Sequence, residues 1–380
     1  MKYFVIAGEV SGDMHAGALV RELKSRDGQA EVAGMGGDCM EAAGCRLVQH
    51  CRNMAFMGVM AVVCSMGKVR RNFRIAEQAL MEMKPDTLIL IDYPSFNLRI
   101  AAFVRRHLPG TRIVWYIPPK VWAWKKWRIH RVARLTDLIL GIFPFEPAFY
   151  ESYGYSCLYV GNPTLDRVRE AAVATGAPAT REDVIALLPG SRRSEITQCL
   201  PVMLAAARSV AAGLAAGGQA KPRIVVAAAP SMDDSVYAPF LQGEELTRDT
   251  LQLLRRARAA VVNSGTATLE TALLGCPQTA VYHVTGSKVL GFLRPLIFST
   301  PFFTLVNIIA GREVIQELVG PRFSRRNIED ELMRLLADND YRRTMSAGYA
   351  SVRTALETRD TVRSTAAAYA AECILGKNKV

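Results

Sequence analysis

The sequence predicts an α/β protein of two Rossmann-like domains, each built on a mostly parallel sheet, with a helical C-terminus. Short apolar runs alternate with helical or loop segments in two successive series, and this alternation is typical of parallel sheets. Three of the runs end in polar turns that lead into helices, which is more than a single Rossmann unit accounts for. The length of 380 residues also suits two domains better than one.

The first series occupies residues 1–164, and the second occupies residues 183–345. The expected strands of the first series are residues 3–7, 87–91, 113–116 and 138–142. Residues 165–183 are expected to form a linker helix that ends near Gly176 and Pro178. The expected strands of the second series are residues 184–188, 223–228, 259–262 and 278–282. We expect residues 346–380 to form a helical segment that packs back on the first domain.

Composition and charge limit the possible partners. Half of the residues are apolar, which is typical of an ordered globular protein, and the formal net charge of +12 points to an anionic partner. Nucleic acid, acidic lipid and a phosphorylated substrate are all open at this point. Glu9 and Asp13 interrupt the early apolar run, so we expect no secretory signal. Residues 295–311 contain prolines and are shorter than the roughly 20 residues that a membrane span needs.

Metal binding is not expected. The eight cysteines show no CxxC or zinc spacing, which predicts reduced thiols in a cytosolic protein. The DxD-like triplet Asp338-Asn339-Asp340 lies between two expected helices with no strand before it, so we expect a capped loop there.

The most informative segment is residues 259–277, with the sequence AAVVNSGTATLETALLGCP. An apolar strand leads into a small-residue turn at Ser264, Gly265 and Thr266, and a helix follows. The unpaired N–H groups and the positive dipole end of such a helix can bind a phosphate. The alternative is an ordinary N-terminal cap on a crossover helix.

Two other turns favour the phosphate hypothesis. In residues 185–196, IALLPGSRRSEI, Arg192 and Arg193 follow a strand and a Pro-Gly turn. Guanidinium groups at this position suit a diphosphate. At the amino terminus, the turn GEVSGD follows the first strand and includes Gly12.

Motifs along most of the chain resemble those of the lipid-A-disaccharide synthases, which are inverting glycosyltransferases of the GT-B fold. The motifs are GEVSGD at residues 8–13, MG at 57–58, KPD at 84–86, IDYPSFN at 91–97, VWAW at 121–124, FPFE at 143–146, VGNP at 160–163, LLPGSR at 187–192, SGTATLE at 264–270 and NIIAGREVIQEL at 307–318. The resemblance implies two Rossmann-like domains that face a cleft.

The resemblance also implies a reaction. UDP-2,3-diacylglucosamine would be the donor and 2,3-diacylglucosamine 1-phosphate the acceptor. The products would be UDP and a β-1,6-linked lipid A disaccharide 1-phosphate, formed without a cofactor. Because both substrates sit in a bilayer, we expect a cytoplasmic enzyme that is peripheral on the inner face of the inner membrane and contacts its anionic surface. The resemblance also implies a role in outer-membrane synthesis in Gram-negative bacteria. A homodimer is compatible with the sequence.

Asp92 is the expected catalytic base, because inversion needs a group that takes the proton from the acceptor 6-hydroxyl. It follows the expected strand 87–91, and open α/β proteins bind ligands at the carboxyl ends of their strands. A turn aspartate before Pro94 is the alternative. The family often carries a second acid at the position of Ser95. His15 is a further expected acid or base, with a solvated or capping histidine as the alternative.

Donor contacts are expected mainly in the second domain. Arg192 and the helix expected to begin at Ser264 would neutralise the phosphates of UDP without a metal. Glu270, expected on the first turn of that helix, would bind the nucleotide ribose, and a dipole-favoured acid is the alternative. The resemblance alone assigns the NIIAGRE motif to the donor cleft. The full set of expected UDP-sugar contacts is Gly12, Arg192, Ser264, Gly265, Thr266, Glu270, Asn307 and Glu313.

Residues 56–74, FMGVMAVVCSMGKVRRNFR, are the expected membrane contact. An apolar stretch precedes a cluster of cations, and a protruding patch of this kind would let a soluble enzyme reach acylated substrates. A buried amphipathic helix is the alternative. The apolar contacts are Met60, Val62, Val63, Met66 and Val69, and the cations are Lys68, Arg70, Arg71 and Arg74.

The segment VWAWKKWR at residues 121–128 places three tryptophans beside three cations. It could stack on single-stranded bases, or it could lie on the acceptor side with its cations near a sugar phosphate, as the resemblance implies. Core tryptophans beside a solvated basic face are the third alternative. Lys120 stands where the family commonly has serine.

Other classes of protein fit less well. A nicotinamide dehydrogenase needs G-x-G-x-x-G after its first strand, and the segment at residues 8–13 lacks that spacing. A nucleic-acid binder would explain the charge but not three phosphate turns, so we expect no nucleic-acid partner. The main alternative is another GT-B UDP-sugar enzyme, a transferase or an epimerase, with a soluble acceptor or substrate.

Overall fold

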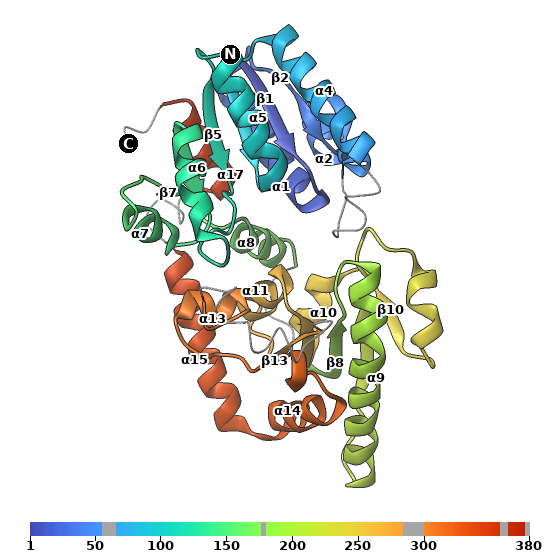
Figure 1. Cartoon of the computed structure of the whole chain (residues 1–380). Helices are drawn as coiled ribbons and strands as arrows, with labels where there is room; N and C mark the ends of the chain where they lie inside the picture. Colours follow the sequence, from blue (N-terminus) through green and yellow to red (C-terminus); the bar gives the residue numbers. More distant parts are fainter. Residues whose placement is uncertain (55–65, 176–179, 284–299, 358–363, 377–380) are drawn as a thin grey trace. The chain divides into compact units, whose positions relative to one another are not determined.

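Two parallel sheets organise the chain, one in each of two units (Figure 1). The computed structural model describes residues 1–54, 66–175, 180–283, 300–357 and 364–376. Unit 1 comprises Met1–Pro163 and Glu357–Val380, and unit 2 comprises Thr164–Leu356. This architecture confirms the prediction of two Rossmann-like parallel-sheet domains.

Unit 1 contains a seven-stranded sheet in the order β3-β2-β1-β4-β5-β6-β7. Its strands are β1 Lys2–Ala7, β2 Glu31–Gly36, β3 Arg46–His50, β4 Thr87–Ile91, β5 Arg112–Tyr116, β6 Leu138–Gly141 and β7 Leu158–Tyr159. Successive side chains of a strand point to opposite faces. In β1, Phe4 and Ile6 therefore enter one hydrophobic cluster, whereas Tyr3, Val5 and Ala7 enter the other.

Helices cover both faces of this sheet (Figure 1). They are α1 Val10–Arg26, α2 Asp38–Ala42, α4 Met66–Met83, α5 Pro94–His107, α6 Ile129–Leu135, α7 Glu146–Glu151 and α17 Ala366–Ile374. Helices α4 and α5 supply Leu80 and Val104 to one cluster. Helices α1 and α17 supply Leu23 and Ile374 to the other, so the end of the described chain is part of the core of unit 1. Arg112 secures this return by donating to the Ile374 carbonyl at 2.6 Å.

Unit 2 contains a six-stranded sheet in the order β10-β9-β8-β11-β12-β13. Its strands are β8 Glu182–Leu188, β9 Arg223–Ala227, β10 Glu245–Thr247, β11 Ala257–Asn263, β12 Gln278–Tyr282 and β13 Glu317–Val319. Its helices are α8 Pro163–Thr175, α9 Arg193–Ala216, α10 Thr250–Arg256, α11 Thr266–Leu273, α13 Leu305–Ala310, α14 Arg325–Ala337 and α15 Asn339–Leu356. Short 3₁₀ helices occur at Cys51–Asn53 and Lys126–Arg128 in unit 1, and at Asp234–Val236, Ala238–Phe240 and Gly320–Arg322 in unit 2.

One helix within the described ranges, α9, is long and apolar enough to cross a membrane. Half of its most apolar window is buried inside unit 2. Leu200 and Leu204 on its inner face are fully buried, and the helix packs against α14. These contacts account for the apolar sequence of α9 as that of a core helix.

Several elements lie outside the predicted pattern. Strands β2, β3, β7, β10 and β13 were not predicted from sequence. In β2, a Cβ atom on Gly34 would lie only 2.0 Å from the Val5 carbonyl oxygen, so the close approach of β1 and β2 requires a glycine there. This glycine makes the sequence of β2 resemble a loop. Residues 165–175 continue helix α8 within unit 2. The expected C-terminal segment 346–380 is divided between α15 in unit 2 and α17 in unit 1.

The packing of α17 gives a test of unit 1. Ile374→Ala should destabilise the protein by about 2–4 kcal/mol, because it leaves a cavity at a side chain that is only 2% exposed. Met81→Ala, at a residue of α4 that is 41% exposed, should change stability by less than about 1 kcal/mol. Chemical denaturation of the two variants measures both effects. Equal destabilisation would contradict the placement of α17 in the core.

Candidate active site

The turn after β4 holds Asp92 in a strained conformation. Asp92 and Tyr93 have φ angles of +43° and +45°, and Ile117, which follows the neighbouring strand β5, has +60°. Such angles cost non-glycine residues about 1–3 kcal/mol each and concentrate at functional sites. The Asp92 N–H donates to the Ile117 carbonyl at 3.1 Å. The buried Asn97 amide donates to the carbonyls of Asp92 at 2.8 Å and Ile91 at 3.3 Å. These bonds fix the direction of the Asp92 side chain.

The first glycine of GEVSGD packs directly against this turn. A Cβ atom on Gly8 would lie 2.3 Å from Cγ of Tyr93, so any larger residue would displace the ring. The Tyr93 hydroxyl donates to the Met54 carbonyl at 2.9 Å. Two sequence motifs that are far apart in the chain therefore meet at the carboxyl edge of the unit 1 sheet.

The environment of Asp92 favours a proton acceptor. Desolvation by the surrounding protein raises the pKa of the Asp92 carboxyl group, and part of the residue remains exposed to solvent. The Lys120 charge and the Tyr93 N–H oppose this rise and lower the pKa in part. Because Asp92 is accessible and its pKa is raised, it can act as a general base.

The other expected residues of the amino-terminal turn lie on α1. Gly12 is buried, and a Cβ atom there would make ordinary contacts with Ala7 and Ile91. His15 lies farther along the helix and is partly buried. The neighbouring Asp13 has a structural role, because its carboxylate accepts from three backbone N–H groups that include those of Gly37 at 2.6 Å and Cys39 at 2.9 Å. The roles expected for Gly12 and His15 stay predictions.

The tryptophans of VWAWKKWR have different environments. Trp122 is buried and donates through Nε1 to Glu146 at 3.1 Å, whereas Trp124 and Trp127 are 46% and 64% exposed. Lys125 lies over the Trp124 ring at 4.0 Å. The segment therefore combines a core tryptophan with exposed, cation-covered rings. Trp122 agrees with the alternative of core tryptophans, whereas Trp124 and Trp127 do not.

Glu146 joins the turn after β6 to Trp122. Its Oε2 accepts from the N–H groups of Ile142 at 2.8 Å and Phe143 at 2.9 Å. Burial raises its pKa to about 7, while these hydrogen bonds, the one from Trp122 and the Lys120 charge act in the opposite direction. Sequence analysis assigned no role to this glutamate.

In unit 2, the Pro-Gly turn after β8 surrounds a carboxylate. Gly190 has a φ of +120°, and a Cβ atom there would lie 2.5 Å from Oε2 of Glu195. That oxygen accepts from the N–H groups of Ser191 at 3.1 Å and Arg192 at 3.3 Å. The Arg192 guanidinium forms an ion pair with the other Glu195 oxygen at 3.1 Å. The turn therefore already holds an anionic group, and Arg192 remains half-exposed beside it.

The adjacent turn after β11 is open. Strands β8 and β11 are parallel neighbours, so their carboxyl ends lie side by side. Helix α11 begins at Thr266, two residues later than expected, and its N-cap Gly265 forms no side-chain cap. Within the described ranges, the N–H groups of Gly265, Thr266 and Ala267 have no hydrogen-bond acceptor. Ser264 is partly exposed and Gly265 has open space at its Cβ position, so an anion can reach these donors.

Glu270 is the fifth residue of α11, just beyond its first turn. The first turn of the helix, which begins at Thr266, holds no acid, so the prediction of a first-turn glutamate was wrong. Glu270 is buried and pairs with Arg167 of α8 at 2.8 Å. Burial raises its pKa, and the Arg167 charge partly offsets the rise. Sequence analysis missed Arg167, which contacts Glu270 only through the fold.

The NIIAGRE motif supports the fold around β13. Asn307 is fully buried, and its amide donates to the carbonyl of Ile315 and to Glu317, both at 2.9 Å. Its oxygen accepts from the N–H groups of Val314 at 2.7 Å and Ile315 at 3.0 Å. This amide is therefore saturated by internal contacts, whereas Glu313 is exposed. The donor contacts expected of both residues stay predictions.

The expected membrane segment is described only in part. Met60, Val62 and Val63 lie outside the described residues. Met66 begins α4, and its side chain is outside them as well. Val69 is partly buried and packs against a core cluster of unit 1, which at this position supports the alternative of a buried amphipathic helix. The cations of α4 are exposed, and they are Lys68, Arg70, Arg71 and Arg74.

Asp338 follows α14 and caps the start of α15, which agrees with the expected capped loop. It accepts from the N–H groups of Asp340 at 3.0 Å and Tyr341 at 2.9 Å at the start of α15. In the described part of the chain, no group of three His, Cys, Asp or Glu residues could hold a metal ion.

Comparison with known proteins decides the family. The family model described as lipid-A-disaccharide synthetase matches residues 3–373. The chain belongs to the lipid-A-disaccharide synthase family. The chain is 36% identical over 353 residues to the lipid-A-disaccharide synthase of Trichlorobacter lovleyi, covering 90% of this chain and 89% of that one. The match to the Geobacter sulfurreducens enzyme is 35% over 370 residues, covering 94% and 93%. This membership confirms the expected enzyme class, a hexosyltransferase of lipid A synthesis.

Solved structures show the same fold. A UDP-GlcNAc 2-epimerase from Neisseria meningitidis bound to UDP-GlcNAc aligns over the full length of both chains with a TM-score of 0.66 at 12% identity. The calicheamicin glycosyltransferase CalG4 covers 100% of this chain and 99% of its own with a TM-score of 0.58 at 16% identity. At these identities the likeness shows the GT-B fold alone. Membership of the lipid-A-disaccharide synthase family, rather than this likeness, favours the synthase over an epimerase.

The buried carboxyl group of Glu146 gives a pH prediction. Its folded-state pKa of about 7 lies above the ordinary value of 4.5, so the folded state holds the proton more tightly than the unfolded chain does. Its stabilising contribution is present below about pH 4.5 and is lost as the pH rises through about 7. The unfolding free energy of the wild type should therefore fall as the pH rises through this window. The slope should be steeper than that of Glu146→Gln by up to about 1.4 kcal/mol per pH unit.

Denaturation curves at a series of pH values measure this difference. Glu151→Gln, at an exposed position on the same helix, is the matched control and should follow the wild-type slope. Identical slopes for the wild type and Glu146→Gln would show that Glu146 does not titrate in this window.

Proposed function

We propose that the protein transfers the sugar of UDP-2,3-diacylglucosamine to 2,3-diacylglucosamine 1-phosphate with inversion, forming the β-1,6 disaccharide 1-phosphate and UDP. The observation that carries the mechanism is the strained turn that holds Asp92 at the carboxyl edge of the unit 1 sheet. A conformation that costs stability and is fixed by a buried amide is typical of a catalytic position.

In this proposal Asp92 takes the proton from the acceptor 6-hydroxyl as the oxygen attacks the anomeric carbon. Its raised pKa makes it a stronger base, and the nearby Lys120 charge opposes that rise and favours the carboxylate form. Lys120 is also exposed and can bind the 1-phosphate of the acceptor. His15 is proposed as a second acid or base on the same unit.

The leaving UDP is proposed to bind unit 2. The N–H groups of Gly265 and Thr266, which have no acceptor among the described residues, and the guanidinium of Arg192 would neutralise the charge that develops as the sugar–phosphate bond breaks. Glu270, held by Arg167, would bind the ribose. Gly12, Ser264 and Glu313 are retained as further donor contacts on the strength of their motifs, and Asn307, whose amide is saturated, would support them by holding the backbone at Val314 and Ile315.

Access to acylated substrates calls for a membrane surface. We propose that the exposed cations of α4 dock the enzyme on the anionic inner face of the inner membrane from the cytoplasmic side. The preceding apolar residues would enter the boundary between head groups and acyl chains.

Asp92→Asn tests the base. Asparagine keeps the shape of the side chain and tolerates the left-handed backbone, so turnover should fall at least ~100-fold with little change in UDP affinity. Turnover is measured by incubating the protein with the two diacyl sugars and following UDP and the disaccharide 1-phosphate. Asp38→Asn, at an exposed acid of the same unit, is the control. Near-normal turnover of Asp92→Asn would remove Asp92 from the mechanism. If the wild type releases UDP with a soluble acceptor and not with the diacyl sugar acceptor, the protein is another UDP-sugar enzyme.

The membrane proposal predicts a charge effect. Replacing Arg70, Arg71 and Arg74 together by glutamine should weaken co-sedimentation with anionic vesicles at least ~10-fold, because each cation near the surface contributes roughly 1 kcal/mol. The folded state should be unaffected, since the three side chains are exposed.

A triple variant of unit 2 with the same change in charge is the matched control and should bind vesicles nearly as the wild type does. It replaces the exposed residues Lys221, Arg326 and Arg343 by glutamine. Equal losses in the two triple variants would mean that net charge, and not α4, determines binding.

A further inference from the structure

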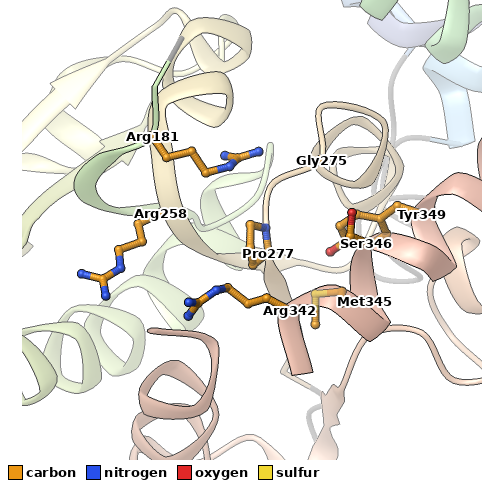
Figure 2. A pocket seen from close by; sticks show the side chains of 8 residues that line it. All are labelled: Arg181, Arg258, Gly275, Pro277, Arg342, Met345, Ser346 and Tyr349. Carbon is orange, nitrogen blue, oxygen red and sulfur yellow. The ribbon is translucent and has the colours of Figure 1, made fainter. Parts of the chain in front are cut away.

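A pocket at the amino-terminal edge of the unit 2 sheet has no role in the proposed reaction (Figure 2). It has a volume of about 270 Å³. Arg181, Arg258 and Arg342 line it together with Pro277 and Ser346. In the view of Figure 2, the side chains of Arg258 and Arg342 lie on the same side of Pro277, and Arg181 lies above it.

The pocket is distinct from the phosphate turns. Arg258 lies at the start of β11, whereas Ser264 follows the end of the same strand. The extended chain between them spans about 20 Å. Phosphates bound at Ser264 therefore cannot also occupy the pocket.

The three arginines bind backbone carbonyls where helices end. Arginine at these positions is favourable because the C-terminal end of a helix carries a partial negative charge. The helices concerned are α10, α11 and α14. Arg181 donates to the carbonyls of Ala257 at 2.6 Å, Leu254 at 3.2 Å and Leu274 at 3.1 Å. Arg258 donates to the carbonyl of Leu336 at 3.0 Å. Arg342 donates to the carbonyl of Leu335 at 2.7 Å and to the side chain of Asn339.

These contacts leave the pocket positively charged. Among the described residues, Asp183 is the one acid that forms an ion pair with any of the three arginines, at 2.9 Å from Arg258. Carbonyl oxygens carry only partial charges, so they do not neutralise the other two guanidinium groups. Each guanidinium has five N–H donors, which is more than the carbonyl contacts use. The cluster therefore offers both charge and donors to a ligand.

We propose that this pocket binds a small anion that carries a phosphate group, separately from the sugar donor. Guanidinium groups recognise phosphate through paired N–H bonds. The volume lies just below the roughly 300 Å³ at which sites for larger organic ligands begin, which suits a phosphate or a phosphate monoester. The exposed Ser346 hydroxyl, which has no hydrogen-bond partner among the described residues, adds a further donor at the pocket wall.

Calorimetric titration of the full chain with inorganic phosphate tests this proposal. Saturating UDP is present throughout, so that the donor site is filled. Ser346→Glu should weaken phosphate binding at least ~10-fold, because it adds a negative charge to the wall without removing any helix-end contact. Ser346→Gln, which is similar in size and neutral, should bind as the wild type does.

A second pair of variants examines the arginines. Arg342→Gln should also weaken binding at least ~10-fold, whereas Arg343→Gln, at the neighbouring exposed position that pairs with Asp340 and does not line the pocket, should not. Circular dichroism checks that each variant is folded. Absence of binding in the UDP-saturated wild type, or equal affinities across all variants, would overturn the proposal.

The source of the phosphate is distinguished in a parallel arm. Phosphatidylcholine vesicles with and without phosphatidic acid replace inorganic phosphate in a sedimentation assay. If Ser346→Glu reduces vesicle binding but Ser346→Gln does not, the pocket accepts a lipid head group. If the Ser346 variants differ only with inorganic phosphate, its ligand is a soluble anion.

Discussion

The parallel alignment of the strands is the constraint on which the rest of the structure depends. It brings the carboxyl ends of all strands of a sheet to one edge, so turns that are distant in the sequence become neighbours. In unit 1 this alignment places Asp92 after β4 beside Ile117 after β5. In unit 2 it places Gly190 beside Ser264. The same geometry gathers helix C-termini at the opposite edge, and arginines bind their carbonyls there.

The carboxyl edges of the two sheets differ in their backbone conformation and in the groups that they present. In unit 1 the backbone is strained, and the buried Asn97 amide holds it so that one carboxylate is presented in a fixed direction. In unit 2 the turn at Gly265 is open, and its N–H groups have no acceptor in the described part of the chain, which suits a negatively charged ligand. Glu195 occupies the neighbouring turn and shows that an acidic group is stable there.

The sequence predicted the central strands because they are short apolar runs buried on both faces, as β1 and β4 illustrate. It missed β2, because the glycines that allow its close packing also resemble a loop. It located the strand-end turns but placed Glu270 on the first turn of α11, whereas Glu270 is the fifth residue of that helix and lies just beyond the first turn. The ion pair of Glu270 with Arg167 joins two helices distant in sequence, and no local pattern could reveal it.

The central claim is that UDP binds the paired turns at the carboxyl edge of the unit 2 sheet. Amide hydrogen exchange of the full chain with and without UDP tests it most directly, because it reports on the N–H groups that the account assigns to the phosphates. UDP is expected to slow exchange at residues 265–267, whose N–H groups have no acceptor among the described residues, and Arg192→Ala is expected to weaken this protection. Protection confined to the opposite edge, around residues 275–277, or absent from residues 265–267 would contradict UDP binding at this turn.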